Sequence, residues 1–315
     1  MYLTLAAGPA ISPVIWSQPE REFSFGSRAK AQMPDLRQLT PPLKPSAICI
    51  GAQKSGTTAL YEYLALHPDV LPSKVKEIDF FNCNTRYAKG LDFYHSHFPR
   101  KPFLSGRKLT FDITPGYLPA ADPAAQRIHA YDRRIKLIAL LRNPARRAFS
   151  AWQMYRKRWH TTPGWFGEWV RGCDSSIKDD YFVRRPPEFG ESFEKDIADE
   201  IKAMEGGRII EMPILWLGMY STHLKHYYHR FAPEQILVIS SEDMRQHTAA
   251  ELRRIEELVG LQPYNWPAES LNPRFQGAYD ETPSAQARSM LQSFYRDHNR
   301  ALFSLLGREF AWEEA

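Results

Sequence analysis

The clearest pattern in the chain is a set of short apolar runs separated by amphipathic stretches. Each run is short enough and rich enough in β-branched residues and leucine to predict a buried strand. The stretches between them place apolar residues at helical spacing. Strands that alternate with helices favour a parallel sheet covered on both faces, so the sequence predicts an α/β fold. The predicted strands are 46–51, 108–114, 135–141 and 235–241, and the predicted helices are 58–66, 144–159, 242–260 and 287–307.

Two regions lack this periodicity. Residues 1–44 contain six prolines and are predicted to form an extended N-terminal arm or leader. Residues 160–217 combine aromatic residues, glycine and proline, and are predicted to be a variable insertion that shapes a pocket or lid. The rest of 45–315 is predicted to be a single domain around one sheet.

Composition is typical of a soluble globular protein. Of the 315 residues, 43% are hydrophobic and 24% charged, and the formal net charge is +5 at pH 7. Charges of both signs occur throughout, so the small basic excess suits an anionic small ligand and does not predict nucleic-acid binding. No uncharged apolar run reaches the length of about 18 residues that a membrane-spanning helix needs, so no membrane partner is predicted.

Three cysteines, Cys49, Cys83 and Cys173, are odd in number and widely spaced. They predict no disulfide framework, and no set of cysteine and histidine residues has the spacing of a zinc site. A Met1 start with neither a membrane anchor nor disulfides favours the cytoplasm. Nothing in the sequence predicts the oligomeric state.

The loop between the first strand and the first helix has the composition of a phosphate-binding loop. It reads GAQKSGTT over 51–58, where Gly51 and Gly56 permit tight turns. Amide groups ahead of a helix point at an anion, and the helix dipole adds attraction. The two glycines have the separation found in nucleoside triphosphatases, but Thr57 stands where those enzymes need lysine, and Lys54 lies inside the loop. This argues against an ATPase or GTPase, and a P-loop kinase and a non-catalytic nucleotide-binding protein are the alternatives.

A second group of anion-binding residues follows the third strand. Arg142 lies at the strand end, where ligands of open α/β sheets bind, and Ser150 lies eight residues further on, about two helical turns later. Arginine offers a permanent forked positive charge to a phosphate group, and serine adds a hydroxyl donor. The sequence therefore predicts two anion sites at neighbouring strand ends of one sheet.

Both motifs resemble those of the sulfotransferases that use 3′-phosphoadenosine-5′-phosphosulfate (PAPS), above all the heparan sulfate sulfotransferases and their bacterial relatives. The first family motif is Gly-x-x-Lys-x-Gly-Thr, which Gly51, Lys54, Gly56 and Thr57 match. The second is Arg-Asp/Asn-Pro followed by Arg and Ser at fixed offsets. It is matched by Arg142, Asn143, Pro144, Arg147 and Ser150.

The resemblance implies a P-loop-like sulfotransferase domain with PAPS as co-substrate, adenosine 3′,5′-bisphosphate (PAP) as product and no metal. Lys54 would neutralise charge on the departing phosphate oxygen. Arg142 and Ser150 would bind the 3′-phosphate, a group that ATP lacks. Arg147 either joins them or is a structural or surface charge. The 5′-phosphate would be held by the backbone and hydroxyl groups of Ser55, Gly56, Thr57 and Thr58.

The same resemblance assigns acid–base chemistry to the segment after the first helix. Glu77, Phe80 and Phe81 match the Glu-x-x-Phe-Phe of the family, which implies that Glu77 is the general base for the acceptor hydroxyl. Aromatic walls would raise the proton affinity of that carboxylate, whereas the neighbouring Lys76 would lower it. The alternative is an exposed glutamate that begins a strand.

Asp112 is a second acidic candidate for catalysis. Relatives carry Glu-Lys-Thr/Ser-Pro-x-Tyr at this place, and Thr114 and Tyr117 match while Ile113 replaces the lysine. Asp112 therefore either orients the acceptor or caps the strand end. The missing lysine argues against a polyanionic glycan as acceptor.

The remaining candidates concern the acceptor and the closing of the site. The acceptor is predicted to be a hydroxyl of a carbohydrate, with a small metabolite or a carrier-bound hydroxyacyl chain as alternatives. Tryptophans either stack on sugar faces or pack internally; they are Trp152, Trp159, Trp165, Trp169 and Trp216. A loop over the nucleotide, by resemblance, contains Arg274, Gly277 and Tyr279. Histidines without an assigned role are His160, His223, His226 and His229.

Overall fold

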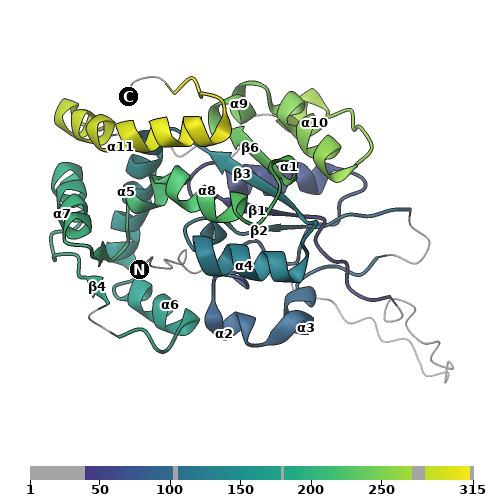
Figure 1. The fold of residues 1–315 in the computed structure, drawn as a ribbon, viewed down its shortest axis with the longest axis horizontal. Helices are drawn as coiled ribbons and strands as arrows, with labels where there is room; N and C mark the ends of the chain where they lie inside the picture. The colour runs from purple at the N-terminus through teal and green to yellow at the C-terminus, as the bar shows by residue number, and fades with distance from the viewer. Residues whose placement is uncertain (1–39, 102–105, 179–180, 272–280, 313–315) are drawn as a thin grey trace, which may run out of the picture.

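The computed structural model describes residues 40–101, 106–178, 181–271 and 281–312. Its centre is a parallel sheet with the strand order β2-β1-β3-β6 (Figure 1). Because the four strands are parallel, their carboxyl ends meet at one edge of the sheet. All four predicted strands are present, which confirms the α/β prediction. They are β1 (Ala47–Gly51), β2 (Phe111–Ile113), β3 (Lys136–Leu141) and β6 (Ile236–Ser240).

Side chains alternate between the two faces of the sheet, and each face is covered. Ile48 and Leu137 belong to a cluster with residues of α4 and α8, whereas Cys49 and Ile138 pack with residues of α1 and α10. In Figure 1, α4 and α8 lie on one side of the strands and α1, α9 and α10 on the other. Burial on both faces explains why these strands read as continuous apolar runs.

The helices include more elements than the sequence predicts. Three predicted helices are present with small differences at their ends: α1 (Thr57–Leu66), α5 (Pro144–Thr161) and α11 (Ala285–Leu306). The sequence does not predict α2 (Asn84–Tyr87), α3 (Gly90–His95), α4 (Ala121–Tyr131), α6 (Trp165–Cys173), α7 (Phe193–Glu205) or α8 (Tyr220–Tyr228). Short 3₁₀ turns occur at Pro115–Tyr117, Trp216–Gly218, Pro233–Gln235 and Ala268–Leu271.

The single helix predicted over 242–260 is wrong. The chain forms α9 (Ser241–Gln246) and α10 (Thr248–Val259), which are separated at His247. His247 has φ −130° and ψ 42°, outside the helical region. The side chain of Ser240 caps α9 by accepting from the amides of Glu242 and Asp243, so the first turn is fixed independently of the second helix.

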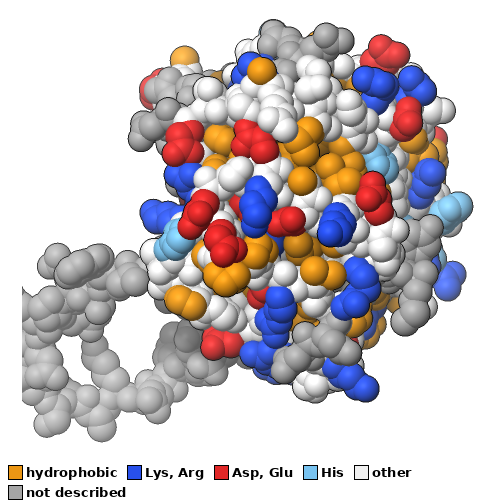
Figure 2. Space-filling view, turned by 90° about the vertical axis from the view of Figure 1, so that its left-hand side faces the viewer, with side chains coloured by type: hydrophobic (Ala, Val, Ile, Leu, Met, Phe, Trp, Pro, Cys, Tyr) orange, Lys and Arg blue, Asp and Glu red, His pale blue; other side chains and the backbone are white. Residues whose placement is uncertain are grey.

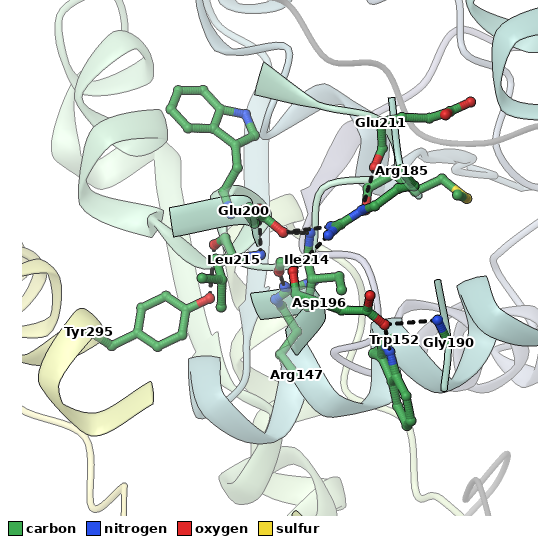
Figure 3. Close-up of polar contacts among 12 residues, drawn as sticks. Arg147, Trp152, Arg185, Gly190, Asp196, Glu200, Glu211, Ile214, Leu215 and Tyr295 are labelled. Carbon is green, nitrogen blue, oxygen red and sulfur yellow. Dashed lines mark hydrogen bonds and ion pairs between the residues drawn. The ribbon is translucent and has the colours of Figure 1, made fainter. Parts of the chain in front are cut away.

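The predicted insertion 160–217 packs around its own apolar cluster, together with parts of α5 and α11. It contains α6, α7 and the two-residue strands β4 (Phe182–Val183) and β5 (Ile209–Ile210). The Glu200 carboxylate from α7 accepts from the amides of Ile214 (2.6 Å) and Leu215 (2.7 Å) and pairs with Arg185 at 3.0 Å (Figure 3). Charged groups inside a core need such partners, so this network fixes the shape of the insertion.

Outside the core, the described chain has three notable features. The predicted arm is described only from Thr40, and its end is tied to the domain where the Leu43 amide donates to the carbonyl of Pro99 at 2.9 Å. No described helix has the length and apolar character needed to cross a membrane. The face shown in Figure 2 carries basic and acidic side chains interspersed with apolar ones.

Candidate functional site

The loop 51–58 connects β1 to α1 at the carboxyl edge of the sheet. Gly51 packs so closely on Leu118 that a Cβ atom would lie 2.6 Å from the Leu118 Cβ. Gly56 has φ +97°, in the left-handed region that favours glycine. No described side chain caps the N-terminus of α1, which begins at Thr57. The amide groups of that first turn therefore retain the partial positive charge that attracts an anion.

Arg142 joins the second predicted anion site to this loop. Its Nη1 donates to the backbone carbonyl oxygen of Lys54 across 3.3 Å. The hydroxyl of Tyr220 in α8 donates to the carbonyl of Arg142 at 2.9 Å and lies beside the buried Ser55. Ser150 is buried on the second turn of α5, the helix that follows Arg142. The structure thus brings the two predicted motifs together.

Positive charge is concentrated around Lys54. Burial lowers the pKa of Lys54, and Arg142, Arg158 and Arg147 lower it further, in that order, whereas Glu77 raises it. These three guanidinium groups are close enough to act on the ammonium group, and one carboxylate partly offsets them. Such an arrangement beside a helix N-terminus favours an anion with more than one negative charge.

Glu77 lies at the same edge of the sheet. Its amide donates to the carbonyl of Ile113 at the end of β2 (3.1 Å), and its φ is 66°. Residues other than glycine rarely adopt this conformation, and those that do are enriched at functional sites. The Glu77 side chain is 24% exposed and forms an ion pair with Lys76. Glu77, the base candidate, is therefore partly accessible to solvent and lies next to the ammonium group of Lys76.

The structure contradicts a catalytic role for Asp112. The residue is fully buried, and burial raises the pKa of its carboxyl group. Three hydroxyl groups donate to this carboxylate: Thr114 at 2.6 Å, Tyr117 at 2.8 Å and Tyr94 at 2.9 Å. A carboxylate so enclosed does not reach an acceptor, and of the two alternatives only the structural one fits.

The Asp112 network nevertheless positions Glu77. The hydroxyl of Thr114 accepts from the amide of Ile78 at 3.0 Å, and the hydroxyl of Tyr117 accepts from the amide of Phe80 at 3.2 Å. These two amides lie one and three residues after Glu77 in the chain. The matching Thr114 and Tyr117 of the sequence motif therefore hold the backbone that carries the base candidate.

Comparisons with known proteins agree with this geometry. Residues 44–276 match the family model described as the sulfotransferase domain. The chain belongs to the sulfotransferase family. It is 30% identical over 290 residues to human heparan sulfate glucosamine 3-O-sulfotransferase 6, a match that covers 85% of this chain and 73% of that protein.

Two further comparisons describe how far the similarity extends. The chain is 26% identical to human bifunctional heparan sulfate N-deacetylase/N-sulfotransferase 3, and the match spans 83% of this chain but only 30% of that protein. A sulfotransferase structure from Alicyclobacillus acidocaldarius superposes with a TM-score of 0.60 at 21% identity, covering 85% of this chain and 98% of that one. The latter shows the shared fold.

This sulfotransferase is a PAPS-dependent enzyme, as its two motifs predict. The residues present fit the nucleotide, because a glycine-bounded loop, an uncapped helix start and a cluster of cations lie at one sheet edge. The two motifs are also in direct contact, because the guanidinium group of Arg142 donates to the backbone carbonyl oxygen of Lys54. Among the described residues, no three histidine, cysteine or acidic side chains form a possible metal site.

Arg147 in this sulfotransferase both acts on the charge of Lys54 and contacts the insertion. It is fully buried, and its Nη2 donates to the carbonyl oxygen of Ile214 in the insertion (Figure 3). Sequence reasoning missed Arg158, whose charge acts on Lys54 and whose guanidinium lies 4.7 Å from the ring centroid of Trp165. The signal was present, because Arg158 lies eight residues after Ser150 and thus near the same face of α5.

The predicted aromatic walls of Glu77 are also wrong. Phe80 and Phe81 are buried in the core, where each contacts the ring of Tyr94 at centroid distances of 4.7 and 4.9 Å. Irregular backbone, with positive φ at Glu77 and Asp79, accompanies the burial of both adjacent rings while Glu77 stays partly exposed. The matching phenylalanines therefore anchor the segment and do not desolvate the base.

Asp79 is a second residue that sequence reasoning missed. It is fully buried and has φ 52°, its Oδ1 accepts from the side chain of Asn82 at 2.9 Å, and Arg86 lies 3.7 Å from its Oδ2. Burial raises its pKa from 3.8 to about 8. Two non-glycine residues with positive φ, Glu77 and Asp79, thus flank Ile78.

The structure decides the role of several of the remaining predicted residues. Trp152, Trp165 and Trp169 are buried in the insertion cluster, so of the two alternatives these three pack internally. His223 is buried against the carbonyl of Trp216 (2.9 Å), and burial lowers its pKa to about 4, so it is a neutral packing residue. Arg274, Gly277 and Tyr279 lie outside the described residues.

Proposed function

We propose that this sulfotransferase moves the sulfuryl group of PAPS to a hydroxyl group of a carbohydrate by in-line displacement. The observation that carries the proposal is the contact of Arg142 with the Lys54 carbonyl, with Glu77 close enough to act on the Lys54 charge. Cations for both ends of the nucleotide and a carboxylate for the acceptor therefore share one sheet edge. Displacement needs these groups together, because charge leaves with the phosphate while a proton leaves the acceptor.

Lys54 and the first amides of α1 have the position to stabilise the departing phosphate. Their charge is fixed before the reaction, so no reorganisation is needed as negative charge develops. Arg142 and Ser150 would hold the 3′-phosphate, and Arg158 would add positive charge from the next turns of α5. The lowered pKa of Lys54 also suits a group that shares its proton with a leaving oxygen.

Glu77 would accept the proton of the attacking hydroxyl. Glu77 pairs with the ammonium group of Lys76, so a cation lies beside the proposed base. An acceptor hydroxyl that displaces Lys76 from one carboxylate oxygen of Glu77 would donate its proton directly to that oxygen. The Asp112 network holds the backbone of Glu77 rigid during this exchange.

Similarity to enzymes named for heparan sulfate supports a carbohydrate acceptor. Ile113 stands where relatives place a lysine, and it is buried. The acceptor therefore meets less positive charge at this place, and we propose a glycan of low negative charge in preference to a densely sulfated one.

Radiolabelled PAPS offered with unsulfated, sparsely sulfated and heavily sulfated glycans tests this proposal. We expect transfer to the first two and loss of transfer in Glu77→Gln by about 10²–10⁴-fold, the usual contribution of a positioned base. The control Glu257→Gln changes an exposed glutamate of α10 and should transfer at the wild-type rate. A wild-type transfer rate in Glu77→Gln would contradict the role of Glu77 as general base. Transfer to small metabolites alone would contradict the proposal of a carbohydrate acceptor.

A further inference from the structure

Two of the three cysteines meet where the segment after Glu77 contacts the insertion. Cys83 directly precedes α2 and Cys173 ends α6, and these two helices lie next to each other in Figure 1. The Sγ of Cys83 lies 3.8 Å from the carbonyl oxygen of Cys173, so the side chain of Cys83 lies against the residue that carries the second thiol. Such proximity is the first requirement for a disulfide.

The backbone on both sides of the pair is already held together. The hydroxyl of Thr85 donates to the carbonyl oxygen of Cys173 at 3.2 Å, and the side-chain amide of Asn84 donates to the carboxylate of Asp174 at 2.6 Å. These bonds join the start of α2 to the end of α6. A bond between the two sulfur atoms would therefore reinforce a junction that exists without it.

We propose that Cys83 and Cys173 are an oxidisable dithiol that forms an intramolecular disulfide when the enzyme meets a peroxide. A cavity of about 380 Å³ is lined by Cys173 and by Asn82 and Asn84, the residues on either side of the buried Cys83, so a peroxide that enters it comes next to the pair. The cross-link would fix two walls of that cavity, one from the base segment and one from the insertion.

The chemistry balances with a peroxide as the oxidant. The Cys83 thiolate attacks one peroxide oxygen, the O–O bond breaks, and hydroxide leaves and becomes water with the proton of the medium. The sulfur of Cys173 then attacks the Cys83 sulfenic acid, the S–O bond breaks, and a second water leaves with the Cys173 proton. The two thiols lose two electrons and two protons in total, and the peroxide is reduced to two waters.

Electrostatics support Cys83 as the attacking sulfur. The neighbouring Cys173 and the nearby Arg86 lower the pKa of Cys83 against the effect of burial, which favours its thiolate form. The neighbouring Cys83 and burial raise the pKa of Cys173. Cys49 lies in β1 and packs against α1 and α10, and burial raises its pKa to about 12, which makes it an inert internal control.

Hydrogen peroxide treatment of the full chain, followed by thiol counting after denaturation and by unreduced peptide mapping, tests the proposal. We expect the wild type and Cys49→Ser each to lose two thiols, to regain both with dithiothreitol, and to yield one linked peptide pair that contains residues 83 and 173. Cys83→Ser and Cys173→Ser should yield no linked pair within one chain.

Three results would overturn the proposal. All three thiols could survive a peroxide dose that oxidises free cysteine completely. The linked peptides could instead contain Cys49 or join two chains. Cys83 could accumulate as a sulfinic acid with no linked peptide, which would mean that Cys173 does not reach it. The peptide map of the wild type decides between these results without any variant.

Discussion

The phosphate side of this enzyme and its insertion differ in how their distant residues are brought together. On the phosphate side, Lys54 and Arg142 are 88 positions apart and meet because β1 and β3 are adjacent parallel strands that end at one edge. In the insertion, Glu200 meets Arg185 and Ile214 through irregular chain with two-residue strands. The first arrangement follows from a rule of sheet topology, and the second depends on one particular polar network.

The two regions differ in what they contribute to the enzyme: the sheet edge carries the proposed chemical groups, and the insertion provides shape. The groups proposed to act on the nucleotide belong to a regular sheet edge, the place where ligands of open α/β sheets bind. The insertion has its own core and its own buried charges, so its shape changes with a few side chains. Variants of the two regions should therefore fail in different ways, either in turnover with the fold intact or in the fold itself.

Glu200→Ala should have the largest effect and should act through stability. It leaves the buried Arg185 without its carboxylate and three amides, those of Ile214, Leu215 and Trp216, without their acceptor. Breaking one partner of a buried pair costs about 3–5 kcal/mol. Urea unfolding measures the loss, and Glu205→Ala, an exposed change on the same helix, should cost almost nothing. Equal unfolding midpoints would show that the network does not hold the insertion.

Lys54→Ala should have the next largest effect and should act through turnover. Loss of one preorganised charge at the leaving phosphate costs about 2.7–4 kcal/mol, or roughly 10²–10³ in kcat. The unfolding midpoint should stay near that of the wild type, because three neighbouring guanidinium groups disfavour the charge of Lys54 in the folded state. Steady-state transfer beside the exposed control Lys202→Ala measures this. A kcat like that of the wild type would contradict the assigned role.

The sequence predicts the phosphate side well and the acceptor side poorly. The phosphate side follows from sheet topology, whereas the acceptor side depends on individual tertiary contacts. Strand patterns and two local motifs suffice to place Lys54 and Arg142 at one edge. No local pattern shows that Asp112 is enclosed by three hydroxyl groups, one of them from Tyr94, 18 positions away. Nor does composition show whether Trp152 stacks on a sugar or donates to Asp196, 44 positions away, as it does at 2.7 Å. Both outcomes depend on tertiary contacts that periodicity does not encode.

Asp79→Asn should change the pH dependence of stability at the junction of the two regions. The folded pKa of about 8 lies above the ordinary 3.8, so the folded state holds a proton that the unfolded chain has released. The free energy of unfolding should therefore fall as pH rises from 4 to 8, by up to about 1.4 kcal/mol per pH unit from this group.

The variant should lack that contribution, so its stability relative to the wild type should improve as the pH rises through this window. Urea unfolding at several pH values between 4 and 8 measures the difference in slope. Asp92→Asn, on the exposed surface of α3, supplies the matched change. Parallel curves for Asp79→Asn and the wild type would show that Asp79 is ionised throughout.

Arg158→Met should have the smallest effect, and it tests whether the cation cluster extends beyond the sequence motifs. Arg158 is half-buried, and its charge acts on Lys54 from α5. A partly exposed charge of this kind contributes about 1 kcal/mol, or roughly fivefold in the KM for PAPS, with little change in kcat. Lys157→Met removes the adjacent, exposed cation and should leave KM unchanged. High salt should reduce the difference between the two variants, because screening weakens exposed charges first. Equal KM values for Arg158→Met and Lys157→Met at low salt would show that Arg158 does not contribute to PAPS binding.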